Sequence, residues 1–335
     1  EEVRQNQCLA WGDGKDYVKA EKNPVVTGDM LPEKCSRVDF RDPKIWEDNG
    51  TYHMLVGCRS EEIPGQVVLF SSKDLKEWKF ETILAENSTG EIGVMWECPD
   101  FFPLGDKHVL ICSPQHMRAK GYEFHNGHNS LYFTGDYDSE KHTFEKDAPV
   151  SLDYGLDFYA PQTFLTEDGR RILIGWMGMA DVEDEYTNRT TEDGWQNVLT
   201  LARELSLKDG IVCQNPVREL SSWWNEEVSF EGQYTGNTDI CYELNLKNTE
   251  KKWEVLIAGG LKLSWSPEEY VFRMEFTDGK LGCGRGLRAR EIKACKDIRI
   301  VVDASCVEVF MNGGKDVFST RFYPEKDQYT VKASG

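Results

Sequence analysis

The sequence has 335 residues, enough for one large domain or two domains of ordinary size. Its 39 Lys and Arg residues against 58 Asp and Glu residues give a formal net charge of -19, which disfavours binding to nucleic acid or to an anionic membrane surface. Hydrophobic residues make up 39% and aromatic residues 12%, too much for a disordered acidic chain, so the composition predicts a folded protein.

No stretch approaches the roughly 18 apolar residues of a membrane span, and residues 1–30 lack the basic start and apolar run of a secretory signal. The ten cysteines are scattered, without a C-x-x-C pair or zinc-ligand spacing, so we expect reduced thiols and no bound metal. These features predict a cytoplasmic protein. Secretion is the alternative, because Asn87 and Asn188 each begin an N-glycosylation sequon.

Short apolar and aromatic segments separated by turn residues recur along the whole chain, which is typical of β-strands. A first pair of segments, residues 7–11 and 17–19, flanks Asp13-Gly14. Later Asn-Gly and Asp-Gly pairs predict hairpin turns at residues 49–50, 168–169 and 209–210. The pattern therefore predicts an all-β protein.

One phrase returns at intervals of about 60 residues and indicates an internal repeat. It consists of a proline, an aromatic or leucine residue, a turn and an apolar strand, and its copies begin at Asp42-Pro43, Cys98-Pro99 and Ala160-Pro161. Two further strands follow the first two copies. Four strands per repeating unit are typical of the blades of a β-propeller.

Both ends of the predicted propeller depart from this repeat. The strand pair in residues 7–19 resembles the second half of a blade without its inner strands, so we expect a first blade that is missing or incomplete, with an inner hairpin ahead of Glu1. After residue 224 the proline-anchored phrase stops and the apolar alternation becomes denser. We therefore predict a propeller domain over residues 1–224 and an antiparallel β-sandwich over residues 225–335.

Two acidic residues occupy matching places at the starts of inner strands, which converge on the axis of a propeller. Asp42 lies immediately before one repeat proline, and Glu97 lies two positions before the next. Facing carboxylates suit glycoside hydrolysis, in which one group protonates the leaving oxygen while the other attacks or stabilises the sugar. A surface or blade-capping role is the alternative. Arg41 could hold a sugar hydroxyl and keep Asp42 ionised, or form an ordinary ion pair.

Aromatic residues of the inner strands could stack on sugar faces, although a place in the core is the alternative for each of them: Trp46, Trp96, Tyr159 and Trp176. No histidine phrase supports thiol chemistry at Cys98, so we predict a packing residue that shapes the neighbouring acid. Three histidines share a polar loop without metal-ligand spacing, and we expect them to be solvated: His116, His125 and His128.

The phrases around these residues resemble those of glycoside hydrolase family 32. Phe40-Arg41-Asp42-Pro43 is similar to the family's R-D-P motif, and Trp96-Glu97-Cys98-Pro99 to its E-C motif. Four later phrases also match, at residues 157–162, 174–177, 203–207 and 303–313, so the resemblance covers nearly the whole chain. It implies a five-bladed β-propeller followed by a β-sandwich. The implied activity is retaining hydrolysis of terminal β-D-fructofuranosides without a metal or cofactor.

The resemblance also implies roles for individual residues. Glu97 corresponds to the general acid/base and Asp42 to the residue that stabilises the transition state through sugar hydroxyls. Four residues are implied in substrate binding: Arg41, Cys98, Tyr159 and Trp176. The family's nucleophile is an Asp in a W-M-N-D-P-N-G phrase that this sequence lacks. We therefore assign the nucleophile to no residue, and expect the 335-residue chain alone to be catalytically impaired.

Two alternatives stay open. Another propeller glycosidase, acting on arabinan or xylan, would also use facing Asp and Glu residues. A catalytically inactive sugar-binding propeller, or a subunit that receives its nucleophile from a second chain, would keep the fold without the reaction. Within the family, the cytoplasmic features favour sucrose or sucrose-6-phosphate over fructans. The expected partner is a small carbohydrate, and the sequence predicts no oligomeric state.

Overall fold

The computed structural model describes residues 3–180, 186–247, 249–325 and 327–335. Strands dominate these residues, and the helices are short. The chain forms two compact units: a first unit of residues 1–118 and 127–150, and a second unit of residues 119–126 and 151–335. Within the described residues, no helix is both long and apolar enough to span a membrane.

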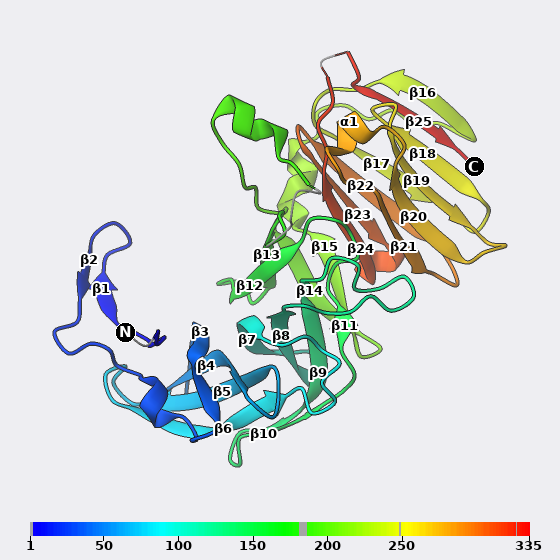
Figure 1. Ribbon diagram of the computed structural model, residues 1–335. Coiled ribbons are helices and arrows are strands. Elements are labelled where there is room, and N and C mark those ends of the chain that lie inside the picture. Colours follow the sequence, from blue (N-terminus) through cyan, green and yellow to red (C-terminus); the bar gives the residue numbers. More distant parts are fainter. Residues whose placement is uncertain (1–2, 181–185, 248, 326) are drawn as a thin grey trace. The chain divides into compact units, whose positions relative to one another are not determined.

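The first unit contains a two-stranded ribbon and two larger antiparallel sheets (Figure 1). The ribbon pairs β1 (Ala10–Gly12) with β2 (Tyr17–Lys19), and the short helix η1 (Gly28–Met30) follows it. The next sheet is a meander of four strands: β3 (Cys35–Asp48), β4 (Thr51–Ser60), β5 (Gln66–Ser72) and β6 (Trp78–Glu86). The last sheet has five: β7 (Trp96–Leu104), β8 (Lys107–Pro114), β9 (Leu131–Asp138), β10 (Thr143–Lys146) and, paired with β9, β11 (Val150–Ser151).

The second unit begins with a third meander and continues into two sheets that share one core. The meander consists of β12 (Tyr159–Leu165), β13 (Arg171–Trp176), β14 (Arg203–Lys208) and β15 (Ile211–Pro216). Helix η2 (Arg189–Asp193) lies between β13 and β14, and helix η3 (Arg218–Trp223) follows β15. The three meanders have the four-strand order predicted for propeller blades.

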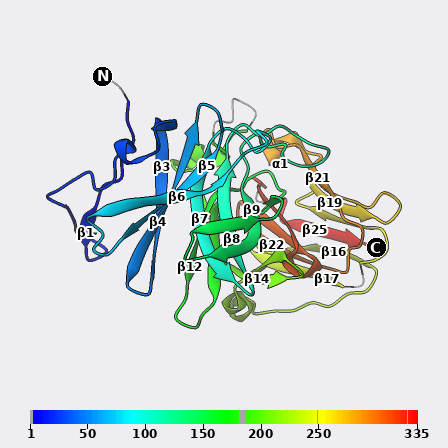
Figure 2. The same cartoon turned by 90° about the horizontal axis from the view of Figure 1, so that it is seen from below.

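The two remaining sheets, at the yellow-to-red end of the chain in Figure 2, form a β-sandwich. Six strands make up one sheet: β16 (Gln233–Asn237), β18 (Trp253–Ile257), β19 (Leu261–Ser266), β20 (Val271–Phe276), β21 (Leu287–Glu291) and β25 (Thr330–Ser334). The other sheet has four: β17 (Tyr242–Lys247), β22 (Asp297–Asp303), β23 (Cys306–Met311) and β24 (Asp316–Arg321). Short helices α1 (Gly279–Gly282) and η4 (Asn312–Gly314) lie in the connections. The predicted all-β fold of propeller blades and sandwich is confirmed.

Two of the predicted hairpins close with the shortest possible turn. Asn49 and Gly50 join β3 to β4 with φ angles of 50° and 72°, and Asp209 and Gly210 join β14 to β15 with 53° and 75°. Positive φ at both central residues is the requirement of a type I′ turn, which asparagine, aspartate and glycine tolerate best. The sequence-based boundary between residues 224 and 225 stays a prediction, because it rests on the repeat pattern, whereas the compact units reflect spatial contacts.

The three repeat prolines each lie at a break in strand register. Pairing shifts between Arg41 and Lys44 in β3, between Glu97 and Asp100 in β7, and between Tyr159 and Gln162 in β12. The residue before each proline has positive φ: 63° at Asp42, 48° at Cys98 and 49° at Ala160. A proline has no N–H to donate to the hydrogen bonds between strands, so a proline within a strand is found at a bulge. A bulge also changes the direction in which nearby side chains point. The repeated phrase therefore encodes a bulge at the same place in three inner strands.

A buried ionic cluster joins the third meander to the sandwich inside the second unit. The guanidinium of Arg203, on β14, contacts Asp153 at 3.1 Å and Glu308, on β23, at 2.6 Å, and all three side chains are almost fully buried. Arg203 also donates to Ser319 Oγ on β24 at 2.6 Å. Burial raises the pKa of Asp153 to about 6 although Arg203 opposes that shift. One cation thus holds two buried carboxylates.

The structure also bears on the cysteines and the sequons. The ten cysteines, all within the described residues, are thiols and form no disulfide. Asn87 is 1% exposed, and its Nδ2 donates to the carbonyl of Gly93 at 2.9 Å. A glycan on that nitrogen would replace a buried hydrogen bond, so this sequon is incompatible with glycosylation in the folded protein. Asn188 Oδ1 accepts hydrogen bonds from Arg285 and Tyr323.

Candidate active site

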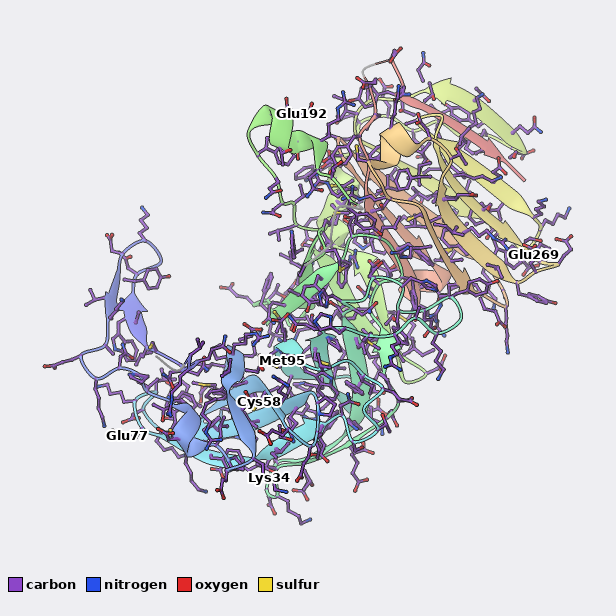
Figure 3. The ribbon with its side chains drawn as sticks, viewed as in Figure 1. Lys34, Cys58, Glu77, Met95, Glu192 and Glu269 are labelled. Atoms are coloured by element: carbon purple, nitrogen blue, oxygen red, sulfur yellow. The ribbon has the colours of Figure 1, made fainter. Side chains whose placement is uncertain are left out.

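The two predicted carboxylates lie at the bulges of β3 and β7, which adjoin in the first unit. Met95, labelled in Figure 3, lies immediately before β7. Oδ2 of Asp42 accepts a hydrogen bond from the backbone N–H of Cys98 at 3.0 Å, and Sγ of Cys98 donates to the same oxygen at 3.7 Å. Asp42 therefore lies against the residue that follows Glu97. The structure places the segments that carry the two carboxylates side by side, and their catalytic roles stay predictions.

Arg41 bonds to Glu97 instead of Asp42. Its Nε donates to Glu97 Oε1 at 2.9 Å, and its Nη1 donates to Asp39 Oδ1 at 2.9 Å. The predicted effect of Arg41 on Asp42 stays a prediction. Side chains two positions apart on a strand point to the same face, so Arg41 shares a face with Asp39. The alternative of an ion pair is confirmed, and contact with a sugar hydroxyl stays a prediction.

Asp39 is a member of this cluster that the sequence analysis missed. Arg59 Nε donates to its Oδ2 at 2.5 Å, in addition to the bond from Arg41. Burial disfavours the ionised form of Asp39, but the hydrogen bonds from Arg41 and Arg59 outweigh it and hold its pKa below the ordinary value. Asp39 lies two positions before Arg41 on the same strand, and this spacing in the sequence could have indicated that their side chains share a face.

Gly57 allows the starts of β3, β4 and β7 to lie close together. It pairs with Arg41 across the β3–β4 ladder. A Cβ atom at this position would lie 2.3 Å from the carbonyl oxygen of Trp96, far inside contact distance. Any side chain here would therefore push the backbone beside Glu97 away. The glycine was not singled out from the sequence, because its partner lies on the next sheet.

Cys98 has the environment of a packing residue. Burial raises the pKa of its thiol, and the negative charges of Asp42 and Glu97 raise it further. A thiolate is the reactive form of cysteine, so this thiol is poorly activated. The predicted packing role beside the acid and the implied part of Cys98 in substrate binding both stay predictions.

The thiols of Cys98 and Cys8 are expected to react very differently with iodoacetamide. Cys8 is exposed, whereas Cys98 is only partly exposed, and partial burial and two neighbouring carboxylates raise the pKa of its thiol. In a short reaction at pH 8, peptide mass spectrometry should find carbamidomethylation at Cys8 and almost none at Cys98. Equal labelling of both residues in the folded protein would contradict this account, and urea-unfolded protein gives the control in which both react.

The two predicted sugar-stacking residues of the second unit are cross-strand partners. Tyr159 on β12 pairs with Trp176 on β13. Tyr159 is 3% exposed, which favours the packing alternative, whereas Trp176 is partly exposed and its Nε1 donates to Asn197 Oδ1 at 3.1 Å. Their role in substrate binding stays a prediction. Trp96 is fully buried, and its Nε1 donates to the carbonyl of Ile92, so it packs in the core of the first unit.

The loop histidines differ from one another. His116 and His125 are exposed, as predicted, and a ring nitrogen of His125 bonds to the carbonyl of Gly121. His128 is only 4% exposed, so its predicted solvation is wrong. The reason is local: Nδ1 of His128 accepts from the backbone N–H of His116 at 3.2 Å, which draws the ring into the loop.

The family models and the relatives found by comparison with known proteins agree on one family. The model of the glycosyl hydrolases family 32 N-terminal domain matches residues 1–216, and that of the family 32 C-terminal domain matches residues 278–334. The chain is 36% identical to sucrose-6-phosphate hydrolase from Bacillus subtilis over 98% of its own length and 70% of the relative's. It is 35% identical to raffinose invertase from Escherichia coli, over 97% of its own length and 68% of the relative's.

The solved structures agree with these relatives. The Bombyx mori family 32 β-fructofuranosidase superimposes with a TM-score of 0.86 at 34% sequence identity, covering 98% of this chain and 69% of that one. A variant of the same enzyme has been solved in complex with sucrose. This chain thus spans 68 to 70% of the length of the three relatives compared.

Propeller blades whose bulged inner strands carry an adjoining Asp and Glu, followed by a β-sandwich, define a glycoside hydrolase. The chain belongs to glycoside hydrolase family 32, and the resemblance noted in its motifs is confirmed.

Proposed function

We propose that this protein hydrolyses terminal non-reducing β-D-fructofuranosides of the sucrose type. The observation that carries the proposal is the contact between the two motif segments, in which Asp42 bonds to the backbone directly after Glu97. The relatives named sucrose-6-phosphate hydrolase, raffinose invertase and β-fructofuranosidase support this substrate class. Its substrate is accordingly a small carbohydrate.

Glu97 is the proposed general acid/base. Arg41 donates to its Oε1, which fixes the orientation of the carboxyl group. In the first step the proton of the Glu97 carboxyl group passes to the leaving glycosyl oxygen as the bond to the fructosyl anomeric carbon breaks. In the second step Glu97 takes a proton from the water that releases fructose.

Asp42 is the proposed stabiliser of the transition state. The N–H of Cys98 donates to Oδ2 of Asp42, which holds the carboxyl group in place. An ionised carboxylate accepts strong hydrogen bonds from sugar hydroxyls, and these strengthen as positive charge develops on the sugar ring. Retention of configuration also requires a nucleophile, and we assign that role to none of the 335 residues. We further propose that the chain alone is catalytically impaired.

We also propose a cytoplasmic location. The support is the set of ten cysteine thiols without a disulfide and the buried amide at the Asn87 sequon. Sucrose and sucrose-6-phosphate are the preferred candidates over fructans.

Sugar release from four substrates tests the proposed function: fructose from three of them and arabinose from the fourth. With the purified product of the complete coding sequence, kcat/KM for sucrose or sucrose-6-phosphate should exceed that for inulin by about tenfold or more. An aryl arabinofuranoside should not be cleaved. Arabinose release without fructose release would favour the other propeller glycosidase, and saturable fructose binding without turnover would favour the inactive binding protein.

The isolated 335-residue chain is the matched comparison for the impairment. Without an assigned nucleophile it should release fructose at least about 10³-fold more slowly than the complete product. Similar rates would contradict the impairment but not the substrate class.

A further inference from the structure

We propose that the first unit carries a second carbohydrate-binding site, remote from Asp42 and Glu97. A pocket of about 310 Å³ lies between the sheets of β3–β6 and β7–β10. Ten residues line it: Trp46, Asp48, Asn49, Thr51, His53, Ser71, Glu81, Tyr137, Ser139 and His142. The proposal does not rest on the proposed reaction, because none of these residues belongs to the carboxylate cluster.

The pocket lies farther along the same strands than the carboxylates. Trp46 follows Asp42 by four residues on β3, which corresponds to about 13 Å in an extended strand. The hairpin turn at Asn49 and Gly50 closes this end of the sheet. A ligand here would therefore occupy a place distinct from the candidate active site.

Rings from both sheets form the walls of the pocket. Trp46 on β3 and His53 on β4 are cross-strand partners, and their rings stack with centroids 5.3 Å apart. His142 approaches from the turn between β9 and β10 and meets His53 edge to face at 5.7 Å. Tyr137 on β9 fixes His142, because its hydroxyl bonds to His142 Nδ1 at 2.8 Å. Rings from two sheets thus line the pocket, and such rings give apolar contact to a sugar together with N–H and O–H donors.

Burial of His53 determines which ring nitrogen carries the proton and keeps the ring neutral. The side chain is 9% exposed, and its Nδ1 is buried without a hydrogen-bond partner among the described residues. A buried N–H without an acceptor is rarer than an unpaired acceptor, so the proton of the neutral ring belongs on Nε2. Burial lowers the pKa of His53, and the charge of His142 lowers it further, although Asp48 and Glu81 act the other way. His53 thus offers a neutral N–H donor.

The charged side chains around the pocket balance one another. Glu81 accepts from Ser71 Oγ at 2.6 Å and from Lys79 Nζ at 2.9 Å. Asp48 accepts from Asn49 Nδ2 at 2.9 Å, and Lys73 donates to Thr51 Oγ1 at 2.5 Å. Two carboxylates and two lysines leave little net charge, which disfavours a strongly charged ligand.

These features together define the chemistry of the ligand. Aromatic walls, N–H and O–H donors, and carboxylate acceptors recognise a neutral polyhydroxylated ring. The volume is at the small end of the range of about 300–1,000 Å³ for ligand pockets, which fits a monosaccharide. A metal ion does not fit, because no three His, Cys, Asp or Glu side chains form a metal-binding group within the described part of the chain.

Histidine NMR tests this site directly, since the chain has only six histidines. Protein labelled with ¹³C in the histidine rings is titrated with D-fructose and, separately, with D-glucose. We expect saturable shifts of the His53 and His142 signals with at least one of the two sugars, while the exposed His125 of the second unit stays unchanged. Absence of any saturable shift with both sugars would overturn the proposal.

Two pocket variants and one active-site variant separate this site from the carboxylate cluster. Glu81→Gln and His142→Ala should each weaken the sugar affinity about tenfold, because each removes polar contacts with the ring. Glu97→Gln should leave the shifts of His53 and His142 unchanged. Full affinity in both pocket variants, or loss of the shifts in Glu97→Gln, would contradict a separate site. If His142→Ala fails to fold, the sugar affinity of Glu81→Gln by itself tests the proposal.

Discussion

Replacement of Glu97 by glutamine is expected to lower kcat for sucrose hydrolysis by about 10³-fold in the product of the complete coding sequence. The glutamine side chain has nearly the same shape, and its amide oxygen can still accept the hydrogen bond that Arg41 Nε donates to Glu97 Oε1. The variant should therefore fold normally and bind substrate with a KM that changes much less than kcat. What it loses is the proton for the leaving glycosyl oxygen. Initial rates of fructose release over a range of sucrose concentrations measure both constants.

Two comparisons show whether the loss arises from the proton. An activated fructoside, whose leaving group needs no protonation, should recover most of the first step in Glu97→Gln. Asp39→Asn is the matched control, because Asp39 is the other carboxylate bonded to Arg41 but has no proposed part in proton transfer. Its kcat should fall by no more than about tenfold. Equal losses in Asp39→Asn and Glu97→Gln would mean that the ion pairs of Arg41, and not an acid, account for the effect.

Replacement of Arg203 by methionine should lower the free energy of unfolding by about 3–5 kcal/mol. The guanidinium is fully buried and is the cation between Asp153 and Glu308, while methionine replaces much of its volume without its charge. Both carboxylates would then stay buried without a counterion. Urea unfolding followed by tryptophan fluorescence measures the difference.

The destabilisation should also depend on pH. Burial raises the pKa of Asp153 to about 6 in the intact cluster, and loss of Arg203 removes a group that lowers it. A carboxyl group with a raised pKa in the folded state favours folding at low pH, where it is protonated. The deficit of Arg203→Met should therefore be smaller at pH 5 than at pH 8.

Arg218→Met provides the control for the Arg203 prediction. Arg218 also bonds to a glutamate of the third meander, Glu204 at 2.8 Å, but 65% of its side chain is exposed. An exposed ion pair contributes about 1 kcal/mol or less, so this variant should be close to the unmodified protein. Equal effects of the two substitutions would contradict the proposed importance of the buried cluster.

The sequence predicted the elements that depend on short-range patterns. Alternation of apolar residues and the Asn-Gly and Asp-Gly turns predicted the strands and two type I′ hairpins. The repeated X-Pro phrase predicted three equivalent inner strands, and the bulge before each proline explains why the phrase recurs. It also placed Asp42 and Glu97 at related positions, where the structure shows them in adjoining segments.

Contacts between distant residues could not be predicted in the same way. Arg41 and Glu97 are 56 positions apart, and Arg203 and Glu308 are 105 apart. Periodicity reports which face of a strand a side chain occupies, but the neighbour on that face depends on how complete sheets pack. The same limit concealed the pocket between His53 and His142, whose walls come from two sheets. Burial of His128 was missed because a backbone N–H, which has no sequence signature, is its partner.

Chemical rescue of Glu97→Ala by azide tests the role of Glu97 most directly. With an activated fructoside as substrate, the variant, made in the product of the complete coding sequence, should form the fructosyl intermediate but release it slowly, because no base activates water. Added azide needs no base, so it should raise the turnover rate and yield a β-fructosyl azide of retained configuration, identified by NMR. The same treatment should not rescue Asp42→Ala. No effect of azide on Glu97→Ala, or equal rescue of both variants, would contradict the assignment of Glu97 as the acid/base of this enzyme.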